Sequence, residues 1–505
     1  RLTDDHPATS TSLNNLAAAY TMQGRYSEAE PLFMEDLNLS QRIFGRNHVN
    51  TAVSLNNLAE LYRLQGRYSE AEPLFIEALE LRKHLLDREH PEVIQSLNNL
   101  AAVYAEQGRY ADAELPLNEA MQLSEQGLGK SHPLTIATIN NLGELYRFQG
   151  RYGETELLFQ EILELRKQTL GKTHPDVLQT LSNLAALYES QGRYDTAKPI
   201  YEQVVELSRQ ELGEAHPLSI ITLNNMAGLY HSQGHYKDAE TLLIQVLDLW
   251  KTIAGDEHPY VASSLHNLAG VYRDQGRYAE AEPLYLQALE IRQRVLGDQH
   301  PDVATSLNNL GLLYANQGRY TEAEPLYQHS LALTRQFLGN DHSEVAFGLN
   351  NLAELCSSQE RYSEAELLYQ QALEIMRRAW GEVHPDVALI LHNLAEVYRH
   401  QKHDPEAESF HSQALKMRQQ LFGKTHPVVA DSLSHLALVY CSQGHHSEAE
   451  AMLVQALEMR QELLGETHPD ISQSFNALAV LYFSQSRYTE AEACLVQALA
   501  IAESG

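Results

Sequence analysis

Residues 51–67 read TAVSLNNLAELYRLQGR, and close copies of this stretch recur along the whole chain. Its apolar residues follow the i, i+3, i+4, i+7 spacing of one helix face: Leu55, Leu58, Ala59 and Tyr62. That spacing is typical of an amphipathic helix with one buried side. The stretch therefore predicts a helix that is repeated many times.

A histidine marks the start of each copy, and the period is constant. Successive histidines are 42 residues apart without insertion or deletion, and ten of the twelve are followed by proline. A fixed period over so long a chain predicts a solenoid in which each repeat contacts mainly its neighbours. We therefore expect a single array over residues 1–505. Its repeats start at His6, His48, His90, His132, His174, His216, His258, His300, His342, His384, His426 and His468.

Each repeat contains a second apolar segment after a tight turn. In the second repeat this segment carries Ala71, Phe75 and Ala78 at helical spacing. The turn before it contains Gly66, which can adopt the left-handed backbone conformation. Ser69 and Glu72 match the capping box that begins a helix. Each repeat is therefore predicted to be a helical hairpin, with Pro in the first turn of its first helix and a Leu-Gly pair after its second.

The repeated pattern resembles a known family. Leu55, Leu58, Ala59, Tyr62, Ala71, Phe75 and Ala78 match the tetratricopeptide repeat, and the 42-residue period resembles the longer variety found in kinesin light chains and nephrocystin-like bacterial proteins. The resemblance covers essentially the whole chain. It implies an all-α, right-handed superhelix of twelve hairpins, with first helices lining a concave groove and second helices on the convex side. Proteins of this family bind peptides or protein surfaces in that groove.

Several C-terminal repeats depart from the turn pattern. Glu360 and Ser486 replace the turn glycine in repeats 9 and 12, and the turn of repeat 10 reads Gln401-Lys402-His403-Asp404-Pro405. Repeat 11 keeps Gly444 but follows it with two histidines. We expect these turns to be looser or specialised.

Composition limits the classes of partner. The net charge is −30, from 67 acidic and 37 basic residues, which disfavours nucleic acid and anionic membranes. There is no run of 18 apolar residues and no charged-then-apolar leader in the sequence. Three cysteines cannot form a disulfide framework, so the cytoplasm is the expected location. The chain starts at Arg1 rather than Met, and we expect it to be a fragment.

The second residue of the Asn56-Asn57 pair recurs along most first helices. Its equivalents are Asn15, Asn99, Asn141, Asn183, Asn225, Asn267, Asn309, Asn351 and Asn393. An amide side chain both donates and accepts hydrogen bonds. It could bond the neighbouring first helix and hold successive repeats together. Alternatively, the resemblance implies that it clamps the backbone of a bound peptide. Asn56 varies more between repeats, which makes it the better candidate for specificity.

Charged residues on the first helices also vary. Glu60 precedes Arg63 by three residues, and Arg147 and Arg399 have equivalent partners, which predicts surface ion pairs. Gly270 stands at that position before Arg273, so Arg273 is the freest to bind an acidic group, although Asp274 lies beside it. Gly228 and Gly270 also clear space on the groove wall. Repeats 6 to 9 are the predicted binding segment: Asn225, His266, Asn267, Arg273, Asn308, Asn309, Asn350 and Asn351, with Arg63, Arg147 and Arg399 as additional candidates.

The sequence predicts no metal site, no cofactor and no catalytic site. Helices pack about 8–10 Å apart, so the repeated histidines lie too far apart to share an ion held at about 2 Å. Additional C-terminal histidines are expected to form a solvated or pH-sensitive patch: His392, His400, His403, His411, His435, His445 and His446. There is no Walker loop and no G-x-S-x-G motif in the sequence.

The two ends of the array lack polar capping helices. The last helical segment keeps Leu495, Val496 and Leu499, although a solenoid normally shields its terminal apolar faces. Either the chain continues, or the ends pair with other copies. The predicted function is a scaffold that binds a protein or peptide segment in the concave groove. The alternatives are a structural spacer or sensor arm of a larger signalling protein, or an array that self-assembles through its ends.

Overall fold

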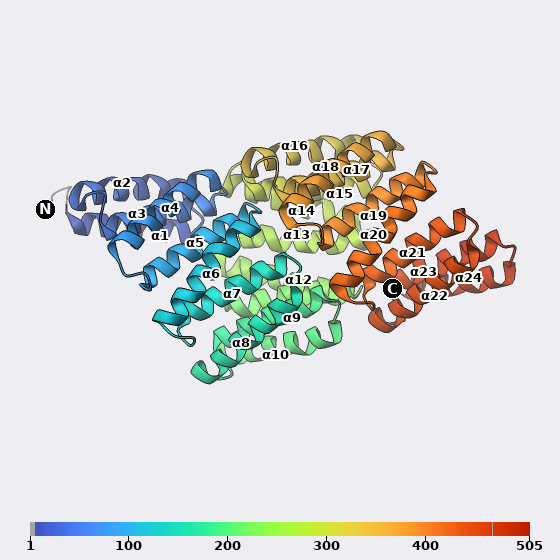
Figure 1. Cartoon of the computed structure of the whole chain (residues 1–505), viewed down its shortest axis with the longest axis horizontal. Helices are drawn as coiled ribbons and strands as arrows, with labels where there is room; N and C mark the ends of the chain where they lie inside the picture. Colours follow the sequence, from blue (N-terminus) through green and yellow to red (C-terminus); the bar gives the residue numbers. More distant parts are fainter. Residues whose placement is uncertain (1–5, 467, 505) are drawn as a thin grey trace. The chain divides into compact units, whose positions relative to one another are not determined.

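The computed structural model describes residues 6–466 and 468–504, and over these residues it has 24 α-helices and no strand (Figure 1). The helices form the twelve predicted hairpins, so the all-α fold is confirmed. The first helices are α1 (Pro7–Met22), α3 (Val49–Leu64), α5 (Pro91–Glu106), α7 (Pro133–Phe148), α9 (Pro175–Ser190), α11 (Pro217–Ser232), α13 (Pro259–Asp274), α15 (Pro301–Asn316), α17 (Ser343–Ser358), α19 (Pro385–His400), α21 (Pro427–Ser442) and α23 (Pro469–Ser484). The second helices are α2 (Tyr26–Phe44), α4 (Tyr68–Leu85), α6 (Tyr110–Gly127), α8 (Tyr152–Leu170), α10 (Tyr194–Leu212), α12 (Tyr236–Ala254), α14 (Tyr278–Leu296), α16 (Tyr320–Leu338), α18 (Tyr362–Trp380), α20 (Asp404–Phe422), α22 (His446–Leu464) and α24 (Tyr488–Ser504). None of these described helices is long and apolar enough to cross a bilayer.

The repeated histidine caps the first helix of its hairpin. In α5, Nδ1 of His90 accepts a hydrogen bond of 3.3 Å from the backbone N–H of Glu92, and Pro91 occupies the first turn. His300 does the same at α15, with 3.1 Å to Asp302 N–H. The imidazole thus satisfies one of the N–H groups that a helix start leaves without an intrahelical partner. The prediction that these histidines start helices is confirmed.

The predicted capping box at the second helix is wrong. Helix α4 starts at Tyr68, one residue before Ser69, and its N-cap Arg67 makes no side-chain capping bond. The Arg67 guanidinium instead pairs with Glu70 at 2.7 Å and with Glu30 of the preceding repeat at 2.8 Å, and it lies 4.0 Å from the ring centre of Tyr62. A cation over an aromatic face and two carboxylates fix the turn instead of a capping box.

Each hairpin except the last buries one large side chain from its second helix against the next first helix. Leu453 of α22 is 0% exposed and lies in one apolar cluster with Leu478 and Leu481 of α23. The equivalent residues of the other internal repeats are also buried: Phe33, Phe75, Leu117, Phe159, Tyr201, Leu243, Tyr285, Tyr327, Tyr369 and His411. Only small residues stand opposite, such as Ala59 and Ala71, so the helices approach closely.

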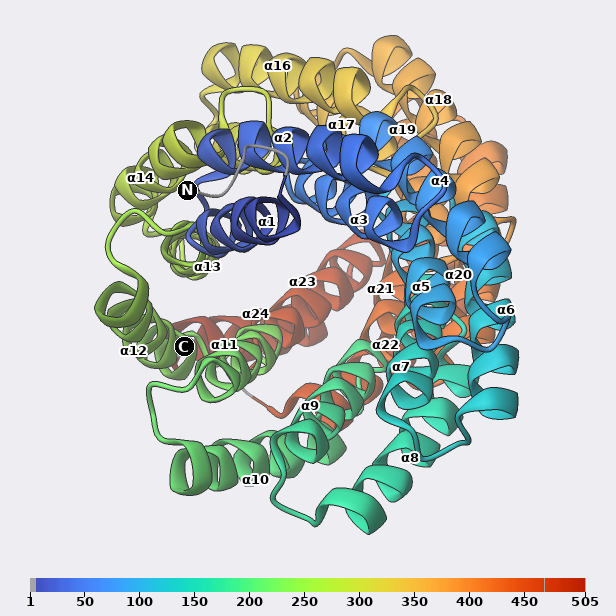
Figure 2. The same ribbon diagram turned by 90° about the vertical axis from the view of Figure 1, so that its left-hand side faces the viewer.

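The chain divides into two compact units. The first comprises Arg1–Gln149, Gly153–Thr180 and Leu247–Val345, and the second comprises Gly150–Tyr152, Leu181–Val246 and Ala346–Gly505. In the first unit, α1, α3, α5 and α7 lie on the inner side of a curved row of hairpins, and α2, α4, α6 and α8 lie on its outer side (Figure 2). First helices therefore share one face, as the resemblance implied.

Both units contain contacts between repeats that are six apart in the chain. In the first unit, Nε2 of His342 lies 3.0 Å from the backbone oxygen of Glu106, which is 236 residues earlier. His300 stands in the same relation to Leu64, at 3.4 Å. In the second unit, a Cβ built on Gly192 would lie 2.9 Å from the His426 ring. The histidine that caps one helix thus also contacts the turn of a distant repeat.

These contacts account for the turn glycine in the first six repeats. In the first six repeats the turn glycine is always present, and a side chain of a distant repeat lies within 4.0 Å of the Cβ it lacks. The three residues that replace it, Glu360, Lys402 and Ser486, all belong to the last six repeats and have φ of 60–61°. Their turns keep the usual bond, as from Arg361 N–H to Cys356 O at 2.8 Å. The expected looser turn geometry in this region is therefore wrong.

Candidate interaction surface on the first helices

The paired asparagines form hydrogen bonds between successive first helices. Nδ2 of Asn57 donates to Oδ1 of Asn14 at 2.7 Å, and Nδ2 of Asn99 donates to Oδ1 of Asn56 at 2.9 Å. Asn141 and Asn98 make the same bond at 3.0 Å. We call this series the asparagine ladder. In each of these bonds the second Asn of one repeat donates to the first residue of the pair in the preceding repeat.

The ladder changes the interpretation of the Asn-Asn pair. The sequence left the second Asn as either a bridge between helices or a clamp on a ligand, and it favoured the first Asn for specificity. In the structure the second Asn is a donor and the first Asn is an acceptor in the bonds between successive repeats. In the second unit, Nδ2 of Asn393 donates to Asn350 at 2.9 Å, and Asn350 is buried. Replacement of the first Asn weakens the ladder: Asn225 lies 3.4 Å from Ser182 Oγ. Variation at the first position thus varies the strength of the bond between repeats.

We expect the Asn141→Ala substitution to lower the free energy of unfolding by about 1–2 kcal/mol. It would leave Oδ1 of Asn98, a buried side chain, without its donor, and an unsatisfied buried acceptor costs about that much. The measurement is urea unfolding followed by circular dichroism. Asn309→Ala is the matched control, because its amide bonds only Thr305 O of its own helix, at 2.9 Å. Equal losses for both variants would contradict the ladder's role.

The ladder is interrupted between repeats 7 and 8. The first residue of the pair is His266 there, whose Nδ1 is buried without a hydrogen-bond partner. Its ring lies edge-on to Tyr285, with centroids 5.3 Å apart. Burial lowers the pKa of His266 to about 4, helped by the charges of Arg292 and Arg273, so the ring is neutral at pH 7. Across from it, Asn309 bonds its own helix rather than the neighbour.

The arginines predicted to face the groove all have acidic partners. Arg63 pairs with Glu60 at 2.7 Å and also with Glu106, and Arg147 pairs with Glu144 at 3.0 Å. Arg399 pairs with Glu396 at 2.7 Å. These contacts match the predicted ion pairs.

Arg273 differs from the expectation. It makes a two-point contact with Asp274, at 2.7 and 3.1 Å, and its side chain is only 16% exposed. An adjacent carboxylate thus occupies the guanidinium that the sequence suggested was freest.

The predicted binding residues fall into two groups. The first unit contains His266, Asn267 and Arg273 on α13 and Asn308 and Asn309 on α15. Asn225 on α11 belongs to the second unit, as do Asn350 and Asn351 on α17. Among the first group, Asn267 is exposed and Asn309 is half-buried.

The two wall glycines do leave space beside the first helices. A Cβ built on Gly270 would meet only the Tyr285 hydroxyl, at 3.6 Å, and one on Gly228 would meet only Glu189 Oε1, at 3.8 Å. Glu189 itself is desolvated there, and burial raises its pKa to about 7. These first-helix walls are therefore partly shielded from water, which strengthens polar contacts made on them.

The sequence did not reveal a second set of bonds between repeats. Arg82 on α4 is buried, and its Nη1 donates to Ser96 Oγ on α5 at 2.6 Å. Arg292 makes the same bond with Ser306, at 2.7 Å. Burial lowers the pKa of both arginines. In the sequence, each of these bonds corresponds to an Arg that is followed fourteen residues later by a Ser.

The surplus C-terminal histidines do not all form a solvated patch. His392 and His411 are buried, and His435 is half-buried beside them. The three rings meet with centroids 4.5–5.9 Å apart. Packing of helices α19, α20 and α21 brings together residues that are scattered in the sequence, so the solvated alternative fails for His392 and His411. His403 and His445 are exposed, as expected.

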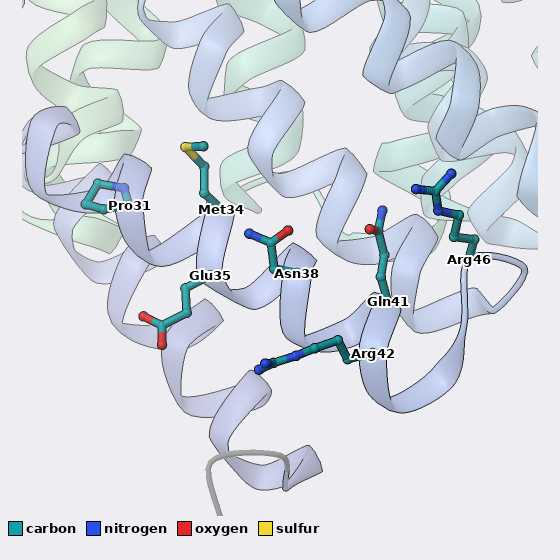
Figure 3. Close-up of a pocket in the computed structure, with 7 residues that line it drawn as sticks. All are labelled: Pro31, Met34, Glu35, Asn38, Gln41, Arg42 and Arg46. Carbon is teal, nitrogen blue, oxygen red and sulfur yellow. The ribbon is translucent and has the colours of Figure 1, made fainter.

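Two hollows lie apart from the inner face. One, of about 730 Å³, is lined entirely by α2 and the loop after it (Figure 3), with Met34, Asn38 and Arg42 along its length. The other, of about 440 Å³, lies in the first unit beside the contact of His342 with Glu106, and Phe148 lines it. The first is open along a single helix, and the second adjoins the contact between distant repeats. Neither contains a predicted binding residue.

Family comparison identifies the repeats. The tetratricopeptide repeat profile matches residues 8–84, 52–126, 92–168, 134–210, 176–252, 218–294, 260–317, 302–378, 386–462 and 451–504. The chain belongs to the tetratricopeptide repeat family. Such repeats act in general as scaffolds for protein interaction. No match was found among curated proteins.

Solved structures with similar repeats include two of kinesin light chain type. The putative kinesin light chain of Podosopora anserina, with nearly identical TPR-like repeats, is 26% identical and covers 41% of this chain and 97% of its own, with a TM-score of 0.35. A variant of it gives a TM-score of 0.36. BtubC (BKLC) from P. vanneervenii is 26% identical and covers 46% of this chain and 91% of its own, with a TM-score of 0.38.

Proposed function

We propose that this tetratricopeptide repeat protein holds a protein or peptide segment along the inner face of its first helices, and that α13 and α15 form the main contact. The observation that carries the proposal is the interruption of the asparagine ladder at these two helices. There the amide of Asn309 bonds Thr305 O of its own helix instead of His266 on the neighbouring helix. An amide that does not bridge to the next helix can pair with an extended backbone instead. Gly270 leaves room for that backbone.

The charge of the chain indicates the kind of segment. With a net charge of −30, the protein attracts basic segments and repels acidic ones at moderate ionic strength. Arg273 is already paired with Asp274, so the surface offers few cations for an acidic ligand. We expect the bound segment to be neutral or basic.

The test begins with a random peptide library displayed on phage and selected against the full chain. Affinities of the selected peptides are then measured by fluorescence polarisation for wild type and for the Asn267→Ala, Asn309→Ala double variant. We expect about tenfold weaker binding by the double variant with nearly unchanged melting, because each lost polar contact contributes about 0.5–1.5 kcal/mol. Selected sequences should be rich in Lys and Arg.

Asn141→Ala serves as the matched control, since it removes a ladder amide away from α13 and α15. It should leave peptide affinity unchanged while lowering stability. The proposal fails if the double variant loses stability and keeps its peptide affinity.

Self-assembly through the ends is the second candidate. Leu495 is 51% exposed, whereas its equivalents in all other repeats are buried, and Leu16 of α1 is 45% exposed. Each end thus presents an apolar residue of the kind that internal junctions cover. Light scattering over a concentration series tests this: the mass should rise with concentration in wild type and not in Leu495→Lys.

Three further features of the protein remain proposals. We take the twelve hairpins to form one array over residues 1–505, supported by their constant period. We place the protein in the cytoplasm, supported by its three free cysteines. We assign it no enzymatic activity, in keeping with the scaffold role of tetratricopeptide repeats.

A further inference from the structure

The asparagine ladder is replaced by a pair of histidines between repeats 10 and 11. His392 on α19 stands where other repeats carry the acceptor Asn, and His435 on α21 stands where they carry the donor Asn. Their ring centroids are 4.5 Å apart and nearly perpendicular. Asp431 lies one turn before His435 on the same helix face. The position that elsewhere holds two amides thus holds two imidazoles and a carboxylate.

One of these imidazoles is held by a second carboxylate. Glu396 on α19 lies 3.0 Å from Nδ1 of His435 and 2.9 Å from Nε2 of His411, on α20. Glu396 is itself fixed by Arg399 at 2.7 Å. A carboxylate on one ring nitrogen places the proton there and leaves the lone pair on the other nitrogen. In the neutral ring the lone pair of His435 is therefore on Nε2, which lies 3.7 Å from Oδ1 of Asp431.

The other imidazole lacks a hydrogen bond among the described residues. His392 is 7% exposed, and its Nδ1 is buried without a partner. Its Nε2 lies 3.9 Å from Oδ2 of Asp431, which is too long for a hydrogen bond. A buried ring aimed at a carboxylate without bonding it is costly, and a ligand between the two would remove that cost.

We propose that His392, Asp431 and His435 bind a divalent transition-metal ion of the zinc class that joins repeats 10 and 11. The three ligand atoms lie within 4.8 Å of one another. An ion with bonds of about 2.0–2.2 Å would require each of them to move by less than about 1 Å. Two imidazoles and one carboxylate suit zinc, and three protein ligands leave a fourth position for water or for a partner's side chain.

Two arginines compete with a metal ion for the Asp431 carboxylate and so limit the affinity of the site. Arg418 lies 3.3 Å and Arg460 lies 3.6 Å from the Asp431 carboxylate. Both keep other partners when the carboxylate turns to a metal, since Arg418 also donates to Ser432 at 2.7 Å and Arg460 to Ser474. We therefore expect weaker binding than in a zinc site with four protein ligands.

The experiment uses the full chain, stripped with a chelator and dialysed into metal-free buffer. Titration with ZnCl₂ in a calorimeter should show one ion bound at this site, with a rise in melting temperature. CoCl₂ should give the visible absorption of a four-coordinate ion. The His392→Asn, His435→Asn double variant restores the ladder residues of the other repeats. It should fold like wild type and lose that equivalent of Zn²⁺ and the Co²⁺ spectrum.

Two further variants separate this site from surface histidines. His266→Asn changes the equivalent residue of repeat 7, which has no such carboxylate arrangement, and should leave Zn²⁺ binding unchanged. His392→Asn alone keeps the bond between Glu396 and His435 and should weaken Zn²⁺ binding by at least about tenfold. Wild type that binds no Zn²⁺, or a double variant that binds as many ions as tightly, would overturn the proposal.

Discussion

We expect the Leu453→Ala substitution to lower the free energy of unfolding by about 3 kcal/mol. Leu453 is fully buried between α22 and α23, in one cluster with Leu478 and Leu481. Truncation of a buried leucine costs about 2–5 kcal/mol, because transfer free energy is lost and a cavity remains. Urea unfolding followed by circular dichroism measures the total, and hydrogen exchange of peptides from α21 to α23 shows where protection is lost.

The last repeat supplies a matched control. Leu495 occupies the same place in α24 but is 51% exposed, so Leu495→Ala should cost less than about 1 kcal/mol. Both variants remove the same atoms from equivalent positions, and only the covering repeat differs. Similar losses for the two would mean that burial by the next repeat is not what stabilises the hairpins. A long array need not unfold in one step, which is why local exchange accompanies the global measurement.

The second large effect is expected from Gly66→Ala, at about 3 kcal/mol. Gly66 has φ of +72°, and a Cβ there would lie 2.7 Å from Cδ of Pro301. A non-glycine residue in this left-handed region costs about 1–3 kcal/mol. Displacing Pro301, which belongs to a repeat six units later, adds about 1–3 kcal/mol of overpacking. Thermal and urea unfolding give the sum, and faster exchange near Pro301 would locate the second component.

Gly276→Ala separates the backbone cost from the cost of displacing Pro301. Gly276 has the same φ of +72°, but no atom lies within 4 Å of the Cβ it lacks. Its substitution should therefore cost only the backbone component, about 1 kcal/mol. A Gly66→Ala variant that is no less stable than Gly276→Ala would show that the contact with Pro301 contributes nothing. Ser486, which adopts φ of +60°, already indicates that the backbone component is tolerated.

Periodicity in the sequence predicted the hairpins because it reports local structure. Leu55, Leu58 and Ala59 recur at a spacing that only a helix places on one face, and all three are buried. The turn glycine was equally informative, since Gly66 needs a positive φ that few other residues adopt. The predicted cap at Ser69 was wrong because Arg67 could reach Glu30 of the preceding repeat, a contact outside the local pattern.

The candidate binding residues were predicted less completely. The sequence located the amides on the inner face, and it anticipated that some would join neighbouring helices. It could not say which ones, because the bond of Asn141 to Asn98 and the turn of Asn309 toward Thr305 depend on side-chain conformation. Arg273 was predicted to be the freest arginine for the same reason. Whether its flexible guanidinium pairs with the adjacent Asp274 depends on side-chain conformation.

The sequence by itself determined the twelve helical hairpins and their register, because those depend on spacing within one repeat and between neighbours. The shared face of the first helices was implied only by the family resemblance. Only the tertiary structure decided that His300 meets Leu64 across 236 residues, and that His392 and His435 meet Asp431. The contact of His300 with Leu64 depends on the small rotation from each repeat to the next, summed over six repeats. The meeting of His392, His435 and Asp431 depends on the conformations of the three side chains. Neither the summed rotation nor the side-chain conformations can be predicted from any single stretch of the sequence.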